Sequence, residues 1–393
     1  MSEILTKNAS AMKFLIDRPA FRDALQRVEM AVDRKPTRPV LGGILIRAER
    51  DSVVVEATDL EIAVRYRIEA VQVDAEGWAI VPGRELVEVV RDLDAETVSA
   101  FLNEQRQFEM EAGEDRCTLV TMESSADPDP GGAPRKKSQQ FPEIPELGAE
   151  PDVVLDKATF LQMVASTRFA VSRVHDSRFP TEGILFEVKD GAVTMVGTDG
   201  RRLACVRRPA QGAASQQRSV LLPKVLDQIA RFGQEEPATA LEAFFLGNQV
   251  GFRVGRLESF GRVLEGEYPN YDSVIPKGGK HVLRAQREQL SKKLRLASHL
   301  TTDAAAVVRL QVAPDTMEIS AEHEGRGRAA ATLEVEYEGP GFTTLFNPIF
   351  LLEGLKAAHG EGVELQMEDP ARPARFRLGE DYTYVVMPLT TFA

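Results

Sequence analysis

The sequence predicts an α+β fold made of three copies of one domain, and two repeated markers carry this prediction. The segment 43–59 returns 140 positions later as 183–199, and a blurred third copy spans 308–321. A second marker keeps nearly the same step, a proline that precedes an apolar run, at Pro82, Pro223 and Pro348. Because solenoid repeats are only about 20 to 50 residues long, this period indicates copies of a whole domain.

Length and composition agree with three domains. At roughly 100 to 200 residues per domain, 393 residues predict two to four of them. A content of 43% hydrophobic and 27% charged residues is ordinary for globular proteins, so each copy can bury its own core.

The first repeat opens with a strand expected over 13–16, followed by an amphipathic helix. Pro19 suits the first turn of this helix, and Pro36 is expected to end it. Apolar residues fall at helical spacing at Phe21, Leu25, Val28 and Val32.

The other two repeats predict the same opening. Strands are expected over 152–155 and 280–283, and the helices after them carry apolar residues at Phe160, Val164, Thr167, Leu290, Leu294 and Ala297. Strands follow through the repeated marker segments, where β-branched residues flank turns. A second helix is expected after each marker proline. Further strands close the repeats at 108–120, 250–264 and 374–388.

The junctions between repeats set the expected domain bounds. The stretch 123–151 holds six prolines and a glycine pair, so it is not regular structure throughout, and part of it is expected to be a mobile surface loop. The second junction, near 276–279, is short. The predicted domains are 12–147, with an extended loop at about 123–140, then 152–277 and 280–393.

Charge is distributed unevenly along the chain. The formal net charge of −12 argues against a polyanionic partner. However, lysine and arginine outnumber acids at the start of every repeat, over 13–38, 157–178 and 280–295. The sequence therefore predicts a recurring basic face and an acidic remainder elsewhere.

No motif points to catalysis. Cys117 and Cys205 lie far apart, which suits a reducing compartment, and no apolar run could span a bilayer or act as a signal peptide. The P-loop, zinc-helix, calcium-loop and nucleophile-elbow motifs do not occur, and five histidines are scattered. We expect a cytoplasmic protein without enzymatic activity, metal or cofactor. An enzyme or ligand binder on a repeated α+β scaffold stays open, because carboxylates could meet in the fold.

Five segments resemble one family. They are 35–42, 58–61, 197–204, 265–276 and 384–389, and in this order they are similar to the bacterial sliding clamp, the beta subunit of DNA polymerase III. The resemblance implies that two chains close head to tail into a ring of six domains around double-stranded DNA. It also implies contacts with a replicative polymerase, an ATP-driven clamp loader and other proteins that carry clamp-binding peptides. A clamp paralogue that serves repair or translesion polymerases is the alternative.

The resemblance implies three sets of site residues. The residues expected to face DNA are Arg22, Arg27, Lys35, Arg168, His175, Phe179, Pro180, Arg287 and Lys292. A pocket for partner peptides is expected at Thr181, Thr198, Gly200, Arg201, Arg202, Leu203, Pro269, Ser273, Val274, Asn347, Phe350, Met387, Pro388 and Leu389. The subunit contact is expected at Cys117, Leu119, His299 and Leu300.

Several of these positions depart from the family. Arg201 stands where histidine is usual, Thr181 where leucine is usual and Ser273 where arginine is common. The usual C-terminal Arg-Leu is replaced by Thr390-Thr391. We therefore expect the pocket to be present with altered specificity.

Overall fold

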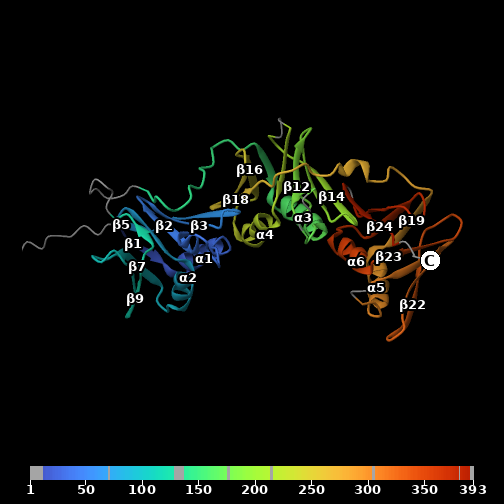
Figure 1. Cartoon of the computed structure of the whole chain (residues 1–393), viewed down its shortest axis with the longest axis horizontal. Helices are drawn as coiled ribbons and strands as arrows, with labels where there is room; N and C mark the ends of the chain where they lie inside the picture. The colour runs from blue at the N-terminus through green and yellow to red at the C-terminus, as the bar shows by residue number, and fades with distance from the viewer. Residues whose placement is uncertain are drawn as a thin grey trace, which may run out of the picture. The chain divides into compact units, whose positions relative to one another are not determined.

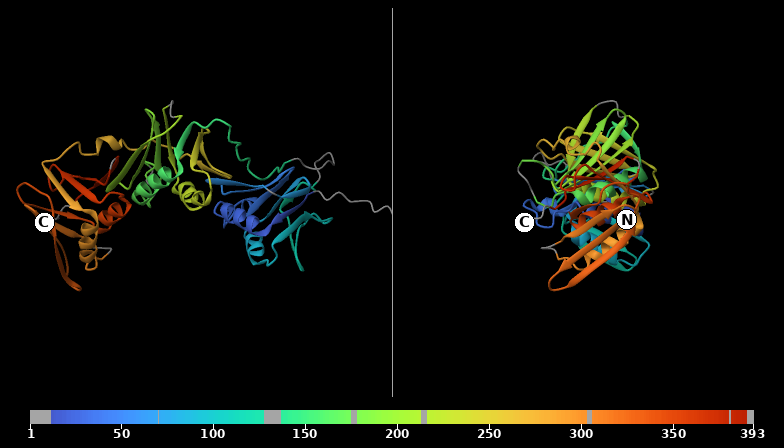
Figure 2. Two further views of the ribbon diagram at one scale, coloured as in Figure 1. Left: turned by 180° about the vertical axis from the view of Figure 1, so that it is seen from behind. Right: turned by 90° about the vertical axis from the view of Figure 1, so that its right-hand side faces the viewer.

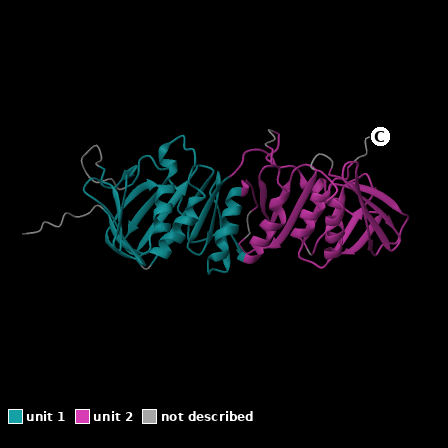
Figure 3. Cartoon of the chain, turned by 90° about the horizontal axis from the view of Figure 1, so that it is seen from below, with its two compact units in different colours: residues 1–157, 224–262 teal, residues 158–223, 263–393 magenta. Residues whose placement is uncertain are grey.

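The computed structural model describes residues 12–69, 71–127, 137–174, 178–212, 216–302, 306–379 and 381–389. The chain forms two compact units, each with a large and a small antiparallel sheet (Figures 1 and 3). Unit 1 comprises residues 1–157 and 224–262, and unit 2 comprises 158–223 and 263–393.

Unit 1 contains a five-stranded sheet of order β5-β1-β7-β8-β9 and a nine-stranded sheet of order β10-β6-β2-β3-β4-β18-β17-β16-β11. Its helices are α1 (Arg18–Glu29), α2 (Gly83–Asp92) and α4 (Pro223–Phe232). Its strands are β1 (Lys13–Asp17), β2 (Gly43–Glu49), β3 (Ser52–Thr58), β4 (Ile62–Ile68), β5 (Gln72–Ala75), β6 (Gly77–Pro82), β7 (Thr97–Leu102), β8 (Phe108–Ala112), β9 (Asp115–Leu119), β10 (Glu123–Ser124), β11 (Val153–Asp156), β16 (Ala240–Phe245), β17 (Gln249–Val254) and β18 (Leu257–Arg262).

Unit 2 contains an eight-stranded sheet of order β15-β12-β13-β14-β26-β25-β24-β19 and a four-stranded sheet of order β22-β21-β20-β23. Its helices are α3 (Lys157–Thr167), α5 (Arg287–Ser298) and α6 (Pro348–Ala357). Its strands are β12 (Ile184–Lys189), β13 (Ala192–Thr198), β14 (Arg202–Pro209), β15 (Gln217–Leu221), β19 (His281–Gln286), β20 (Val308–Ala313), β21 (Thr316–His323), β22 (Gly327–Glu334), β23 (Phe342–Phe346), β24 (Gly362–Met367), β25 (Ala374–Arg377) and β26 (Tyr382–Val386).

Each large sheet joins two consecutive repeats. In unit 1, β4 of the first repeat pairs with β18 of the second, and in unit 2, β14 of the second repeat pairs with β26 of the third. The second repeat therefore contributes elements to both units. The three-domain boundaries drawn from the sequence stay a prediction, because compactness follows the sheets and not the repeats.

The helices confirm the α+β prediction of two per repeat and correct one of their ends. Asp17 caps α1 by accepting a hydrogen bond from the Ala20 amide at 2.8 Å. The helix ends at Glu29, well before Pro36, so Val32 lies beyond it. The amides of Ala31 and Val32 bond carbonyls only three residues back, at 2.9 and 3.0 Å, and this tight turn ends the helix.

The expected loop at 123–140 is anchored at both ends. Glu123 and Ser124 form β10, which pairs with β6. The buried Glu123 carboxylate accepts hydrogen bonds from the Ser138 hydroxyl and, at 3.2 Å, from the Gln139 amide. These parts of the predicted loop are therefore fixed, and its centre, 128–136, lies outside the described residues.

In each unit the helices cover one face of the large sheet, and the junction between repeats crosses the other face (Figures 1 and 2). We call residues 141–148 the strap. Phe141 and Ile144 of the strap are buried in a cluster with Leu45, Ala63 and Phe260, and Leu147 packs against it. The strap thus forms part of the core of unit 1.

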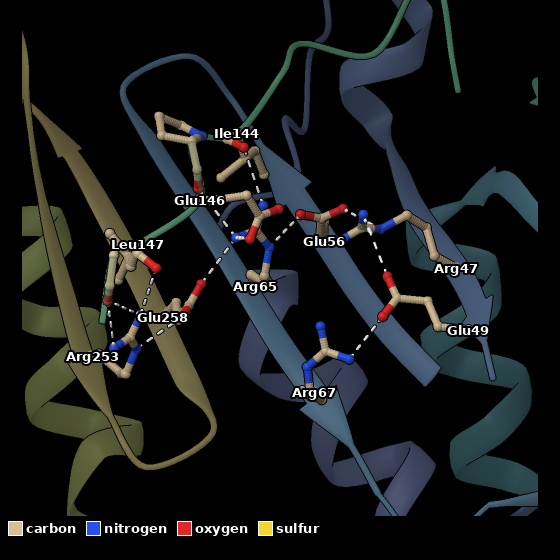
Figure 4. A network of polar contacts seen from close by, with 12 residues as sticks. Arg47, Glu49, Glu56, Arg65, Arg67, Ile144, Glu146, Leu147, Arg253 and Glu258 are labelled. Carbon is tan, nitrogen blue, oxygen red and sulfur yellow. Dashed lines mark hydrogen bonds and ion pairs between the residues drawn. The ribbon is translucent and has the colours of Figure 1, made fainter. Parts of the chain in front are cut away.

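Two arginines hold the strap by its backbone (Figure 4). Arg65 on β4 donates to the carbonyls of Ile144 and Pro145, both at 3.1 Å, and Arg253 on β17 donates to those of Leu147 and Gly148 at 3.1 and 3.2 Å.

Arg65 is also the centre of a buried ion-pair network. Its guanidinium lies 2.6 Å from Glu56, 3.0 Å from Glu258 and 3.1 Å from Glu146. The neighbouring carboxylates hold the pKa of Arg65 above its usual value, against the opposing effect of burial. The charge of Arg65 is therefore compensated where β4 of the first repeat pairs with β18 of the second.

Candidate functional site

Unit 2 carries a groove of about 1100 Å³ on the face of the large sheet that the repeat junction crosses. One wall comes from the turn between β13 and β14, and another from the junction 269–280. The third wall comes from the end of β26 and the hairpin between β24 and β25. We call this cavity the unit 2 groove.

The turn that forms the first wall is built by Thr198 and Asp199. The Thr198 hydroxyl donates to the Arg202 carbonyl at 2.7 Å, and an Asp199 carboxylate oxygen accepts from the amides of Arg201 and Arg202, both at 3.0 Å. Gly200 adopts a left-handed backbone with φ of 81°. Aspartate favours such turns because its side chain bonds the backbone two residues on.

Replacing Gly200 with alanine is expected to destabilise unit 2 by about 1 kcal/mol. A Cβ at Gly200 would meet no atom within 4 Å, so the loss arises from backbone strain alone. Gly362→Ala is the matched control, because its Cβ would also meet nothing within 4 Å and its backbone is not left-handed. Denaturant unfolding measures both variants, and equal losses would contradict the assignment of strain to Gly200.

The floor of the groove is apolar. Leu203 on β14 and Val385 on β26 are paired on neighbouring strands. Both are buried with Tyr268 and Tyr271 in one cluster. The Tyr268 hydroxyl donates to the Val196 carbonyl at 3.0 Å, and the Tyr271 hydroxyl donates to Glu187 at 2.6 Å. Burial is the main cause that raises the pKa of both tyrosines, so these hydroxyls act as donors.

Arg202 connects the groove to the helices behind it. Its guanidinium lies 3.0 Å from Asp199, pairs with Glu353 on α6 and donates to the Phe169 carbonyl at 2.7 Å. The same group lies over the Phe350 ring, 4.4 Å from its centroid. A cation stacked and paired in this way fixes the turn against α6.

The rim of the groove combines apolar anchor sites with positive charge. Phe179, Val274 and Met387 are 42%, 51% and 44% exposed. Exposed basic residues surround them at Arg178, Arg201, Lys277, Lys280 and Arg372, and acids at Asp199 and Glu368 are already paired with Arg202 and Lys280. An apolar floor with a basic rim suits an extended peptide that carries apolar anchors and acidic residues.

Most of the predicted pocket residues line this groove. They are Thr181, Thr198, Gly200, Arg201, Arg202, Leu203, Pro269, Ser273, Val274 and Met387. Four others do not line it. Asn347 caps α6, Phe350 lies under Arg202, and Pro388 is buried, while Leu389 bonds the Leu345 carbonyl through its amide at 2.8 Å.

The sequence prediction missed further lining residues. They are Arg178, Asp199, Tyr271, Ile275, Pro276, Lys277, Gly278, Gly279, Lys280, Glu368, Arg372, Pro373 and Val385. The sequence could have indicated 275–280, because these residues form the short junction between the second and third repeats, which carry the rest of the predicted pocket. Glu368 and Arg372 carried none, since they reach the site only through the hairpin between β24 and β25.

Some of the residues predicted to face DNA are exposed, and others have partners within the protein. Lys35 and Lys292 are exposed, and the exposed Arg295 lies near Lys292 on α5. Arg22 is half-buried and pairs with Asp23 at 3.0 Å. Arg287 is half-buried and donates to the Gly360 carbonyl at 2.7 Å.

Other members of that set have different surroundings. Arg27 is not on the surface as the prediction required. It is buried between Tyr66 and Phe232 and pairs with Glu235 at 2.9 Å. Pro180 is buried, whereas Phe179 lies on the rim of the unit 2 groove. Arg168 directly follows α3, is half-buried and has a polar or electrostatic partner. His175 lies outside the described residues.

Two of the residues predicted for the subunit contact lie on a strand at the edge of a sheet. Cys117 and Leu119 belong to β9, the outermost strand of the five-stranded sheet of unit 1. His299 and Leu300 follow α5 in unit 2, whose four-stranded sheet ends in β22. A strand at a sheet edge presents unpaired backbone groups to another chain.

Among the described residues no group of His, Cys, Asp and Glu could hold a metal ion. The described helices also include none with the length and apolar character needed to cross a bilayer.

Three family models match the chain in order. The N-terminal, central and C-terminal domains of the DNA polymerase III beta subunit match residues 12–128, 154–270 and 272–390. Among curated relatives named Beta sliding clamp, that of Caulobacter vibrioides (strain NA1000 / CB15N) is 28% identical over 386 residues, which covers 96% of this chain and 100% of the relative. That of Escherichia coli (strain K12) is 26% identical over 383 residues, with shares of 96% and 100%.

Solved structures have the same fold. The beta sliding clamp of C. crescentus superposes with a TM-score of 0.86 at 26% identity, covering 97% of this chain and 100% of that one. The DNA polymerase III subunit beta of Pseudomonas aeruginosa gives the same TM-score, identity and coverage.

Proposed function

This chain belongs to the DNA polymerase III beta subunit family, the bacterial sliding clamps, and from that premise we propose that it is a processivity factor for a DNA polymerase. The observation that carries the proposal is that all three domain models match in order over a chain folded like solved clamps. The protein tethers a replicative polymerase to double-stranded DNA in the cytoplasm and catalyses no reaction itself. Its three domains follow the repeats 12–147, 152–277 and 280–393.

In this proposal two chains form a closed ring around DNA. Exposed basic residues such as Lys35 and Lys292 face the phosphates, where charge attraction holds the duplex without reading its sequence. Retention then depends on ring closure and not on affinity. An ATP-driven loader is needed to open the ring.

The decisive experiment compares closed and open DNA. The protein is loaded onto nicked circular DNA with a bacterial clamp loader and ATP, freed of unbound protein by gel filtration, and the DNA is then cut once. We expect retention on the circle and release after cutting, because a ring slides off a free end. Equal retention on circular and linear DNA would contradict encirclement.

The proposed subunit contact uses the open edge of β9, and Cys117 reports on it. We expect a thiol reagent at about pH 8 to label Cys117 quickly in dilute protein and slowly when the dimer forms. Burial raises the pKa of Cys205 to about 12, so that thiol stays largely protonated at pH 8 and reacts slowly in the folded protein. A Cys117→Ser variant provides the background rate, and light scattering gives the mass at each concentration. Labelling that is independent of concentration while the mass doubles would exclude β9 from the contact.

The unit 2 groove is proposed to take the clamp-binding peptides of polymerases and other partners. Val274→Asp is expected to weaken binding of a synthetic peptide with a polymerase clamp-binding motif by about 2 kcal/mol, roughly 30-fold. Val274 is 51% exposed, so the fold should be unaffected. Ile349→Asp is the matched control, because Ile349 is 44% exposed on α6 and does not line the groove. Fluorescence anisotropy measures both, and equal losses would contradict this site.

A further inference from the structure

Unit 1 contains the same turn that forms the first wall of the unit 2 groove. The Thr58 hydroxyl donates to the Ile62 carbonyl at 2.8 Å, and Asp59 accepts from the amides of Glu61 and Ile62 at 3.0 and 2.9 Å. Leu60 has a left-handed φ of 76°, close to that of Gly200. The two turns therefore have the same hydrogen bonds and the same backbone shape.

The strands beside the two turns also correspond. In unit 1, Ala63 pairs with Phe260, as Leu203 pairs with Val385 in unit 2. The amide of Arg262 bonds the Glu61 carbonyl at 2.9 Å, and in unit 2 the amide of Met387 bonds the Arg201 carbonyl at 2.8 Å. The turn and the end of β26 that wall the unit 2 groove thus have counterparts in unit 1.

The junctions between repeats correspond in sequence. Phe141-Pro142 with Ile144 matches Tyr268-Pro269 with Tyr271 in spacing. Each pair of anchors is buried at the equivalent place, the first against Ala63 and the second against Leu203. The strap 141–148 and the junction wall of the unit 2 groove therefore start with the same pair of buried anchors.

The two sites differ three residues after the second anchor. Val274 is exposed at the edge of the unit 2 groove, whereas Leu147 turns inward onto its cluster. Gly251 leaves room for it, because a Cβ there would lie 2.5 Å from Leu147 Cδ2. The remaining cavity in unit 1 is about 60 Å³, against 1100 Å³ in unit 2. The chain itself fills the space that is open in unit 2.

The strap is bound as an extended peptide would be. Its apolar side chains point into the cluster, and its carbonyls at 144, 145, 147 and 148 accept bonds from Arg65 and Arg253 (Figure 4). Main-chain bonds together with apolar anchors are a general mode of peptide recognition. A tethered segment acts at an effective concentration on the order of millimolar, so a free peptide competes poorly with it.

We propose that unit 1 holds a second peptide-docking groove, which residues 141–148 occupy as a built-in ligand. Its ligand class is an extended peptide with an apolar anchor, here Leu147, whereas Phe141 and Ile144 correspond to Tyr268 and Tyr271 on the groove floor. The proposal rests on the peptide docking proposed for the unit 2 groove. The strap thereby closes the unit 1 counterpart of the unit 2 groove.

The test uses the full chain with the unit 2 groove silenced by Val274→Asp. The probe is a labelled synthetic peptide of residues 139–149, and two variants open the strap. Leu147→Ser removes the anchor that turns inward, and Arg253→Met removes the bonds to the carbonyls of Leu147 and Gly148 while leaving the apolar walls intact. We expect either opened variant to bind the probe at least about tenfold more tightly than Val274→Asp alone, because the tethered competitor is weakened.

Hydrogen exchange of the strap amides accompanies the titration. Fast exchange without probe binding would overturn the proposal, and so would a strap that stays protected in both variants, since it would then be a fixed part of the core. The polymerase-motif peptide is titrated against the unaltered chain in parallel. Its failure to bind would reject the function proposed for the unit 2 groove, independently of the result with the strap probe.

Discussion

Replacing Arg65 with methionine is expected to lower the free energy of unfolding of unit 1 by about 3 to 5 kcal/mol. The substitution leaves the buried Glu56 carboxylate without its partner at 2.6 Å and removes two hydrogen bonds to the strap carbonyls. Glu56 then keeps its pair with Arg47 at 3.1 Å, but its desolvation is compensated less well than with both cations. Denaturant unfolding measures the loss, and hydrogen exchange should show the strap amides opening first.

Arg67→Met is the matched control for Arg65. Arg67 lies two residues further along β4 and pairs with Glu49 at 2.8 Å, but the two side chains are 42% and 36% exposed, against 6% for Arg65 (Figure 4). An exposed ion pair contributes at most about 1 kcal/mol. If Arg65→Met and Arg67→Met destabilise the protein equally, burial is not the source of the effect.

Replacing Arg202 with methionine is expected to destabilise unit 2 by about 3 to 5 kcal/mol and to abolish peptide binding in the unit 2 groove. The variant leaves Asp199 and Glu353 without their shared cation and removes the stacking on Phe350. Because Asp199 also holds the turn amides, the groove wall should loosen. Peptide titration and denaturant unfolding on the same protein measure both effects.

Arg201→Met separates the two effects of Arg202. Arg201 is the adjacent residue, is exposed and lines the same groove. Its loss should leave stability within about 0.5 kcal/mol and weaken only peptides with acidic residues. Stability unchanged in Arg202→Met would refute the central position assigned to this guanidinium.

The repeats predicted the architecture because they preserve local chemistry. The turn at Thr198 and Asp199 was visible in the sequence together with its copy at Thr58 and Asp59. The helix openings were also predicted, since Pro19 and the apolar spacing act within a few residues. Sheet pairing between repeats was not predictable, because the contact of β4 with β18 spans nearly two hundred positions.

Basic residues were harder to assign than turns. Arg27 and Arg22 lie on one helix and read alike in sequence, yet Arg27 is buried against Glu235 and Tyr66 while Arg22 is half-exposed. Only the packing of α4 and its following residues decides between them. The same holds for the strap, whose prolines suggested a loop although Phe141 and Ile144 are core residues.

The sharing of the second repeat between the two sheets constrains how the gene can change. A chain cut between 151 and 152 would strip β18 from β4 and leave a long apolar edge open to aggregation. Recombination that exchanges the second repeat would therefore damage both large sheets at once. Viable exchanges would have to preserve the β4–β18 and β14–β26 seams, so these four strands constrain one another while the rest of each copy is free to diverge.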